Sequence, residues 1–306
     1  MMHFKICFLA LLATNVACAA TIGPEGEKGE SREQFAELDA QNWQEVFFDA
    51  GTGDWRDKWS LDGLKAEVSN SAEGMNFRAG AVYKEDASHA VLWTKRSFTG
   101  DLKIEYEYTR TDEATRAVNI LYIQATGDET QGLDRDISRW ADQRTVPAMR
   151  VYWGQMHTYH ISYAAYGSKP VTDDYDYIRA RRYRPDVLPR KNGPIFQPDY
   201  QRTGLFATGV PHQVTVIKQG DDLFMKISNA DKDYLCHWKT GGQPPITEGH
   251  IGLRHMYTRS ARYRDFRVSV LKGTGQAGQP AGPWPRLTTR LSTGLPTQGG
   301  RHALVQ

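Results

Sequence analysis

Between about residues 44 and 271, apolar and polar side chains alternate with a period of two, and no other feature constrains the fold as strongly. Successive side chains of a β-strand point to opposite faces, so the alternation predicts strands that each bury one face. In Leu102–Arg110, for example, every second residue from Leu102 to Tyr108 is apolar. Comparable runs cover 118–125, 149–153, 158–165, 212–219, 223–228, 234–239, 250–257 and 266–271.

Many short strands separated by turns favour a sandwich or a barrel over a helical fold. We predict an all-β fold, a single antiparallel β-sandwich. Gly220-Asp221-Asp222 predicts a hairpin turn, because glycine and aspartate tolerate positive φ. A short helix is expected at 31–43, with Ser31 as its N-cap. Long loops are expected at about 126–148 and 167–211, and loops of that length are usually functional.

The N-terminus has the features of an export signal. Lys5 precedes an apolar run at 6–13 that is too short to span a bilayer, and small residues typical of signal cleavage follow at Ala17, Ala19 and Ala20. Cys18 raises the alternative of a lipoprotein, but Asn15 stands where that signal usually has leucine. We therefore expect an exported protein, periplasmic or secreted, and regard lipidation as the weaker alternative.

These patterns divide the chain into four parts. We assign residues 1–20 to a signal peptide, 21–44 to an N-terminal segment and 45–271 to a β-sandwich that binds or catalyses. Residues 272–306 are rich in glycine and proline and show neither strand nor helix periodicity, so we expect a flexible C-terminal tail.

Charge and motifs exclude several functions. The net charge of +2 is too small for a protein that binds the phosphate backbone, so no nucleic-acid partner is expected. No later apolar stretch is long enough for a membrane span. Cys236 is the one cysteine beyond the predicted signal peptide. We expect it to be a buried strand residue rather than a nucleophile. The G-x-S-x-G, H-E-x-x-H, P-loop, C-x-x-C and G-x-G-x-x-G motifs are absent. We expect a monomer with no cofactor and no catalytic metal.

The densest group of polar and aromatic residues is at 150–163. Tyr159, Ile161 and Tyr163 share the better core face of a strand, which places His160 and Ser162 on the opposite face. A histidine there is either a buried residue bonded to a neighbour or a reactive group in an open site. The residues alone leave both interpretations standing.

Arginines cluster at 176–184 and 254–264. They are either solvated surface charges or a clamp for carboxylate or sulfate, since guanidinium groups bind oxyanions with paired donors. Ile251 and Leu253 are apolar strand residues, so Arg254 is expected on the face opposite them.

Five segments together resemble the YesU-like family, namely 89–112, 119–127, 157–167, 177–185 and 249–268. The resemblance covers about residues 45–270. It implies a concanavalin A-like jelly roll, related in fold to lyases and hydrolases that hold polysaccharide across a concave sheet. Some members are encoded beside enzymes that degrade rhamnogalacturonan or other uronate polymers. The resemblance therefore implies a fold and a substrate class, and no catalytic residue is transferred with it.

Our first hypothesis is β-elimination on a uronate-containing glycan, sulfated or not, such as ulvan or rhamnogalacturonan. The C5 proton of a uronate becomes acidic once the carboxylate is neutralised, and His160 is the candidate base because its ordinary pKa is near neutrality. The candidate proton donors to the leaving oxygen are Tyr257, Tyr159 and Tyr122. The candidate substrate-binding residues are Arg150, Arg179, Arg181, Arg254, Asn119, Gln124, Trp93, Trp153 and His255. The enzyme is a polysaccharide lyase if the leaving group is a sugar, and an oligosaccharide dehydratase if it is a free hydroxyl.

Two other functions fit the same fold. A glycoside hydrolase would use Glu105 with Glu107, which share a strand face about 7 Å apart. A non-catalytic glycan-binding module would need the arginines and aromatics but not His160. Asp265 is a candidate ligand of a structural Ca²⁺.

Overall fold

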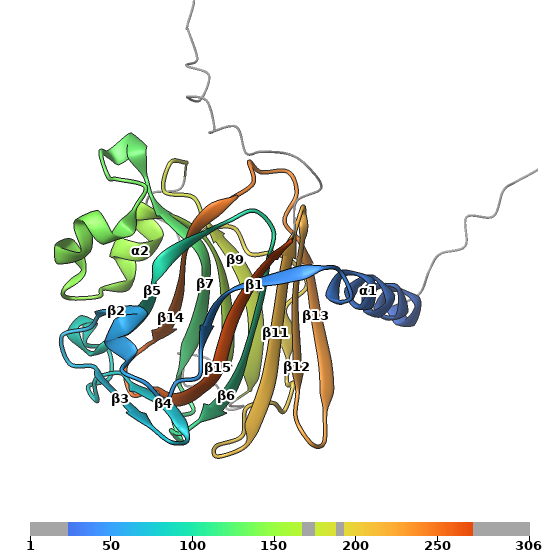
Figure 1. Ribbon diagram of the computed structural model, residues 1–306, viewed down its shortest axis with the longest axis horizontal. Helices are drawn as coiled ribbons and strands as arrows, with labels where there is room; N and C mark the ends of the chain where they lie inside the picture. Colours follow the sequence, from blue (N-terminus) through green and yellow to red (C-terminus); the bar gives the residue numbers. More distant parts are fainter. Residues whose placement is uncertain (1–23, 167–174, 188–192, 272–306) are drawn as a thin grey trace, which may run out of the picture. The chain divides into compact units, whose positions relative to one another are not determined.

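The computed structural model describes residues 24–166, 175–187 and 193–271. The predicted signal peptide and C-terminal tail lie outside this part of the chain. Two antiparallel β-sheets face each other in it (Figure 1). The predicted all-β sandwich is therefore confirmed.

Sheet A has eight strands in the order β13-β12-β11-β6-β15-β4-β3, and β1 also pairs with β15. Their bounds are β1 (Trp43–Asp49), β3 (Glu67–Ser71), β4 (Gly74–Arg78), β6 (Leu102–Arg110), β11 (Pro211–Gln219), β12 (Asp222–Ser228), β13 (Asp233–Lys239) and β15 (Ser260–Leu271). The predicted hairpin joins β11 to β12, with Gly220 at φ 53°.

Sheet B has seven strands in the order β10-β9-β8-β7-β14-β5-β2. Their bounds are β2 (Trp59–Asp62), β5 (Ala90–Thr99), β7 (Ala117–Gly127), β8 (Met156–Tyr166), β9 (Asp176–Tyr183), β10 (Tyr200–Gln201) and β14 (Glu248–His255). Strands β9 and β10 fall where a long loop was expected at 167–211, so that prediction was wrong for these segments.

The main core lies between the two sheets. Ile161 and Leu253 of sheet B and Ile104 and Val216 of sheet A are fully buried there, each at the position that the alternation assigns to the core. Burial of apolar side chains such as these stabilises the fold by about 25 cal/mol per Å². Cys236 is also buried in this core and unpaired, as predicted, and burial raises the pKa of its thiol well above the usual value.

Residues 128–155, which we call the insert, connect β7 to β8 along the side of sheet B that faces away from sheet A (Figure 1). The insert contains two 3-10 helices, η3 (Glu129–Gln131) and η4 (Ile137–Arg144), and the helix α2 (Met149–Gln155). The loop expected at 126–148 is therefore partly helical. The strand predicted at 149–153 was wrong, because these residues form most of α2.

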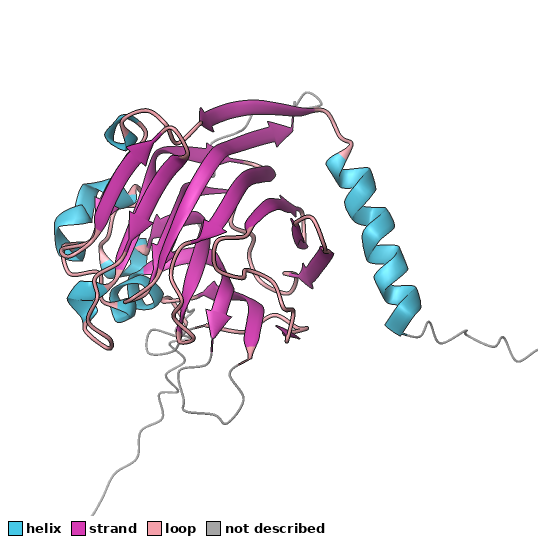
Figure 2. Ribbon diagram, turned by 90° about the horizontal axis from the view of Figure 1, so that it is seen from below, coloured by secondary structure: helices cyan, strands magenta, loops and turns pink. Residues whose placement is uncertain are grey.

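Helix α1 (Pro24–Asp39) packs on the opposite side of the sandwich from the insert (Figure 2). The helix predicted at 31–43 is confirmed as far as Asp39, but Trp43 already begins β1. Phe35 contacts Phe224 of β12 with ring centroids 5.8 Å apart. Within the described ranges, no helix is long and apolar enough to cross a membrane.

Candidate functional site

Strand β8 alternates as the sequence predicts. Tyr159, Ile161 and Tyr163 point into the core between the sheets. His160 and Ser162 therefore lie on the face of sheet B that points away from sheet A, which we call the outer face. The insert packs on part of this face, and His160 is only 2% exposed.

Two rows of cross-strand neighbours run over the outer face. From β5 to β9, the first row is Trp93, Gly252, Tyr122, His160 and Arg181. The second row is Val91, Arg254, Ile120, Ser162 and Arg179. Neighbouring strands are about 4.8 Å apart, so His160 stands directly between Tyr122 and Arg181. A Cβ at position 252 would lie 2.4 Å from the Trp93 ring, which explains the glycine there.

Both ring nitrogens of His160 have hydrogen-bond partners. Nδ1 lies 2.6 Å from the Tyr183 hydroxyl, and Nε2 lies 2.7 Å from the Ser162 hydroxyl. Burial, and then the positive charges of Arg181, Arg254 and Arg179, hold the pKa of His160 well below its usual value. The imidazole is therefore neutral at neutral pH, the state that a general base needs.

Arg181 and Arg179 lie side by side on β9 but differ in their partners. Arg179 donates through Nε and Nη2 to the carboxylate of Asp199, with Nε 2.8 Å from Oδ1. Arg181 is partly buried, and its side chain makes no hydrogen bond or ion pair with any residue in the described ranges. Its guanidinium is therefore available to an anion that reaches the outer face.

Arg254 is fully buried and has no carboxylate partner in the described part of the chain. Its Nη2 donates to Nδ1 of His89 and to the carbonyl oxygen of Pro147, both at 2.8 Å. Its guanidinium carbon lies 4.3 Å from the ring centroid of Tyr152. The buried Nε and Nη1 atoms have no partner among the described residues. Arg254 is thus a second cation that an anion could neutralise.

His89 belongs to the same cluster, although the sequence did not single it out. Burial, reinforced by the charge of Arg254, lowers its pKa to about 3. The ring is therefore neutral, with Nδ1 accepting from Arg254 and the proton on Nε2. Tyr257 stacks on this ring at 4.9 Å between centroids. The structure thus brings Tyr257 next to Arg254 through His89.

The insert is fixed to the outer face through one buried carboxylate. Oδ2 of Asp62 accepts hydrogen bonds from Nε of Arg144 (2.7 Å), Nε1 of Trp93 (2.7 Å) and the hydroxyl of Tyr152 (3.0 Å). The Trp93 and Tyr122 rings stack at 5.4 Å, and the Tyr122 and Tyr152 rings at 6.0 Å. Trp93 was predicted to stack on a sugar, but its side chain is only 1% exposed. That prediction was wrong: the ring supports the insert instead.

Four other predicted site residues point away from the outer face, which corrects their assignment. Tyr159 is a core residue between the sheets, and Asn119 donates to the Tyr108 hydroxyl. Gln124 donates to the carbonyl oxygen of Gly100, and His255 contacts the Tyr263 hydroxyl and stacks on Phe77. Asn119 and His255 each stand next in sequence to a residue on the outer face. Since successive strand residues point to opposite faces, both side chains point toward the core.

The remaining candidates lie on the insert or within the cluster. Arg150 is exposed and forms an ion pair with Asp86 at 3.0 Å, at the end of the insert near His89. Trp153 is partly buried and packs against the apolar cluster beneath the insert. Tyr122 is fully buried beside His160, and burial raises the pKa of its hydroxyl.

The carboxylates of the hydrolase hypothesis lie on the other sheet. Glu105 is 3.3 Å from Nζ of Lys103, and Glu107 accepts from Gln213 at 3.1 Å. Both belong to β6 of sheet A and are separated from His160 by the core. Asp265 lies 3.4 Å from Nε of Arg264. No group of three or more histidine, cysteine or acidic side chains suited to a metal occurs within the described residues.

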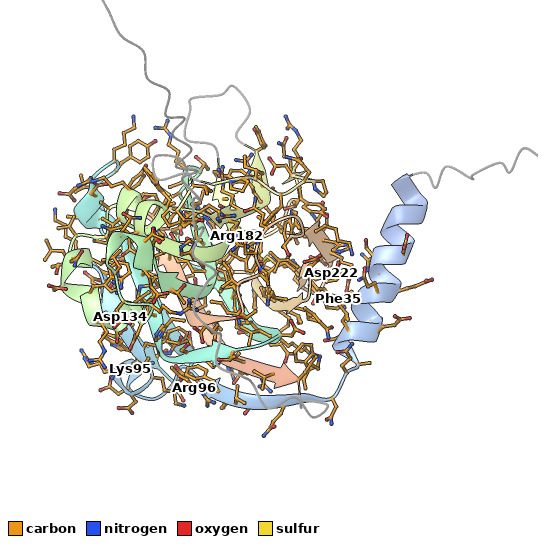
Figure 3. The ribbon with its side chains drawn as sticks, turned by 90° about the horizontal axis from the view of Figure 1, so that it is seen from above. Phe35, Lys95, Arg96, Asp134, Arg182 and Asp222 are labelled. Carbon is orange, nitrogen blue, oxygen red and sulfur yellow. The ribbon has the colours of Figure 1, made fainter. Side chains whose placement is uncertain are left out.

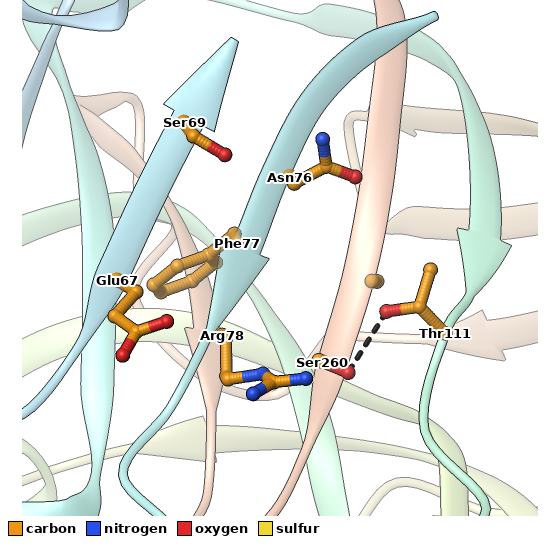
Figure 4. A pocket seen from close by; sticks show the side chains of 8 residues that line it. Glu67, Ser69, Asn76, Phe77, Arg78, Thr111 and Ser260 are labelled. Atoms are coloured by element: carbon orange, nitrogen blue, oxygen red, sulfur yellow. Dashed lines mark hydrogen bonds between the residues drawn. The ribbon is translucent and has the colours of Figure 1, made fainter. Parts of the chain in front are cut away.

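Two open cavities lie elsewhere on the described surface. One of about 380 Å³ lies along β3, β4 and β15 and is lined by Glu67, Asn76 and Arg78, where Thr111 and Ser260 share a hydrogen bond of 2.8 Å (Figure 4). The other, of about 490 Å³, lies where the insert meets β5 and β14 and includes Asp136 and His250. Neither cavity is lined by one of the candidate catalytic or substrate-binding residues.

No family model matches the chain, and no curated protein matches it. Among solved structures, it is similar to a protein of unknown function with a galectin-like fold from Bacillus subtilis, at 18% identity and a TM-score of 0.55. That match covers 75% of this chain and 100% of the other. Two further matches have lower TM-scores. The carbohydrate-binding module CBM66 from Bacillus subtilis has 11% identity, a TM-score of 0.41, and coverage of 70% and 96%. Basic winged bean lectin with Tn-antigen has 9% identity, a TM-score of 0.47, and coverage of 75% and 100%.

The similarity to the galectin-like protein, together with the two antiparallel sheets, establishes the jelly-roll fold. The resemblance to the YesU-like family stays a prediction, since no family model bears on it. Tyr183 was not named as a site residue from the sequence, although it lies two residues from Arg181 on β9 and so points to the same face. The sequence missed Asp62 and Arg144 because neither lies in a patterned motif, and it missed His89 because this residue stands at the very start of the segment 89–112.

Proposed function

We propose that the outer face of sheet B binds the carboxylate of a uronate-containing glycan and catalyses β-elimination on it. The observation that carries the proposal is the convergence of Arg181 and Arg254, neither of them paired with a carboxylate in the described chain, on the neutral imidazole of His160. Arginine is well suited to carboxylates because its planar group offers several fixed donors.

Each step has a candidate group. Neutralising the carboxylate with Arg181 or Arg254 acidifies the C5 proton. His160 then takes that proton, the C5–H electron pair forms the C4–C5 double bond, and the C4–O bond breaks. Tyr183 or Tyr257 returns a proton to the leaving oxygen, since burial raises the pKa of both hydroxyls and keeps them protonated.

One observation favours a second candidate, the non-catalytic glycan-binding module. His160 and Tyr183 are almost fully buried, so a sugar that contacts only the exposed surface reaches Arg181 but not the imidazole. Elimination therefore requires the insert to shift when substrate binds, whereas simple binding does not. Turnover separates the two functions.

The test is a screen of fragments of ulvan, rhamnogalacturonan, alginate and glucuronan. We expect ultraviolet absorbance from a conjugated double bond, and the product mass separates dehydration, which loses one water, from chain cleavage. His160→Gln should lower the rate by about 10²–10⁴-fold, the usual contribution of a general base. Arg181→Gln should mainly weaken binding.

Arg264→Gln is the matched control, because Arg264 is exposed on sheet A. It should leave both rate and affinity unchanged. Binding without any chromophore would reject elimination in favour of the binding module. New reducing ends without a chromophore, lost in Glu105→Gln, would instead indicate a hydrolase.

A further inference from the structure

Two basic residues occupy core positions of the sandwich, one on each sheet. On β9, Ile178 and Ala180 point into the core between the sheets, and Arg182 has the same parity. On β11, Val214 and Val216 point into the core, and Lys218 has the same parity. Both basic side chains are only 3% exposed. A chain that places lysine and arginine where apolar residues are expected must compensate their charges.

Arg182 is the less well satisfied of the two (labelled in Figure 3). Its guanidinium carbon lies 5.5 Å from the ring centroid of Tyr159. Its Nε and Nη1 atoms are buried and have no hydrogen-bond partner within the described ranges. Because a buried donor without a partner costs about 1–3 kcal/mol, this arrangement indicates a ligand for these atoms.

Lys218 has one weak partner. Its Nζ lies 3.8 Å from Oδ1 of Asp101, and that oxygen also accepts from the backbone nitrogen of Gly220 at 3.1 Å. Burial lowers the pKa of Lys218, and Arg182 is close enough to contribute to this shift. The two cations therefore repel each other in a poorly solvated place.

The nearby charges do not cancel. Arg184 is fully engaged with Asp186, donating from Nε at 2.8 Å and from Nη2 at 2.7 Å. Asp101 offsets one of the two remaining cations. Counting only Arg182, Arg184, Lys218, Asp101 and Asp186, one positive charge is left in excess, and Nε and Nη1 of Arg182 have no partner among the described residues.

We propose that Arg182 and Lys218 bind a small inorganic oxyanion, of the size of sulfate or phosphate, between the two sheets. Such an anion offers oxygens to both side chains at once and neutralises the excess charge. The site is distinct from the outer face, because Arg182 and Arg181 are adjacent on β9 and point to opposite faces. It does not depend on the proposed enzymatic activity.

The test follows the thermal unfolding midpoint of the full chain while sodium sulfate is added at constant ionic strength. We expect a saturable rise in the midpoint, because a ligand that binds only the native state stabilises it. Lys218→Met should abolish most of this rise. Arg182→Lys keeps the charge but not the fork of donors, and should weaken sulfate binding by about tenfold.

Arg181→Gln is the matched control, since sulfate bound at the outer face would be lost in that variant while the interior site would remain. Lys218→Met removes a buried charge at an apolar position, so it should fold without sulfate. Circular dichroism checks this, and Arg182→Lys provides the comparison if it does not fold. An equal sulfate response in unchanged and Lys218→Met protein, or no saturable response in unchanged protein, would overturn the proposal.

Discussion

The hydroxyl oxygen of Tyr183 lies 2.6 Å from Nδ1 of His160, and this contact joins the neighbouring strands β9 and β8 on the outer face of sheet B. Nε2 of the same ring lies 2.7 Å from the hydroxyl of Ser162. A neutral imidazole has one donor and one acceptor nitrogen, so the three groups form a chain along which a proton can pass. The two hydrogen bonds hold the ring in one orientation.

Tyr183→Phe should keep the fold and slow the proposed elimination. The phenyl ring fills nearly the same volume, but Nδ1 of His160 loses its partner, and with it a fixed orientation and tautomer. We expect kcat to fall by about 10–100-fold, with little change in KM, because Arg181 still binds the carboxylate. Steady-state rates on a uronate oligosaccharide measure both constants. An unchanged kcat would remove Tyr183 from the mechanism.

The face that each residue occupies could be predicted from the sequence wherever the alternation is regular. It placed His160 and Ser162 opposite Tyr159 and Ile161, and Arg254 opposite Leu253, as the structure has them. It does not apply across a bulge. The pairing of β7 with β8 shifts register between Ile123 and Thr126, and Gln124 adopts φ 55° there, so the position of Gln124 could not be read from parity.

The covering of the outer face could not be predicted, because it depends on contacts between distant segments. Val151, Tyr152 and Trp153 are strand formers by composition, and this led to the wrong prediction of a strand at 149–153. Their helix is stabilised instead by tertiary packing, with Tyr152 bonded to Asp62. The same contacts bury Trp93, which as an isolated aromatic residue looked like a sugar platform.

Asp62→Asn should release the insert. The change leaves the buried guanidinium of Arg144 without its carboxylate, and loss of one partner of a buried pair costs about 3–5 kcal/mol. We expect a lower free energy of unfolding in urea and faster proteolysis within 128–155. Asp86→Asn is the control, because the Arg150–Asp86 pair is exposed and should contribute little. Equal effects of the two changes would mean that Asp62 does not anchor the insert.

His255 should make the protein sensitive to acid. Burial, and then the charge of Arg259, lowers its pKa to about 3, whereas an unfolded chain has a histidine pKa of about 6.5. Between these values the unfolded state binds a proton that the native state does not. Stability is therefore present above pH 6.5 and falls as the pH is lowered, by up to about 1.4 kcal/mol per pH unit for this residue.

His255→Phe should reduce that dependence, because phenylalanine can still stack on Phe77 but cannot titrate. Urea unfolding at several values between pH 7 and pH 4 measures the slope. The pKa of His89 is also lowered to about 3, so the stability of the variant should still depend partly on pH. If the free energy of unfolding changed equally with pH in the unchanged protein and in His255→Phe, His255 would not be a source of the acid sensitivity.

Phe35 should determine whether α1 stays docked on sheet A. Among the side chains of α1 that the structure describes, it alone is buried, against Phe224 and Ile217 (Figure 3). Leu38 of the same helix is partly buried and packs against this cluster. Two further contacts are polar: Ser31 lies 2.9 Å from Nδ1 of His237, and Gln34 donates to Asp222 at 2.9 Å. A helix of 16 residues is marginal in water when it stands alone.

Phe35→Ala should therefore undock and unfold α1 while the sandwich stays folded. Hydrogen exchange should become fast at 31–39 and remain slow in β12, and the loss of helical ellipticity should be confined to about one helix. Glu33→Ala, at an exposed position of the same helix, should leave exchange unchanged. If Phe35→Ala also accelerated exchange throughout β11 and β12, α1 would be an integral part of the sheet A fold. Retained protection would instead show that Leu38 and the polar contacts of Ser31 and Gln34 hold the helix without the aromatic ring.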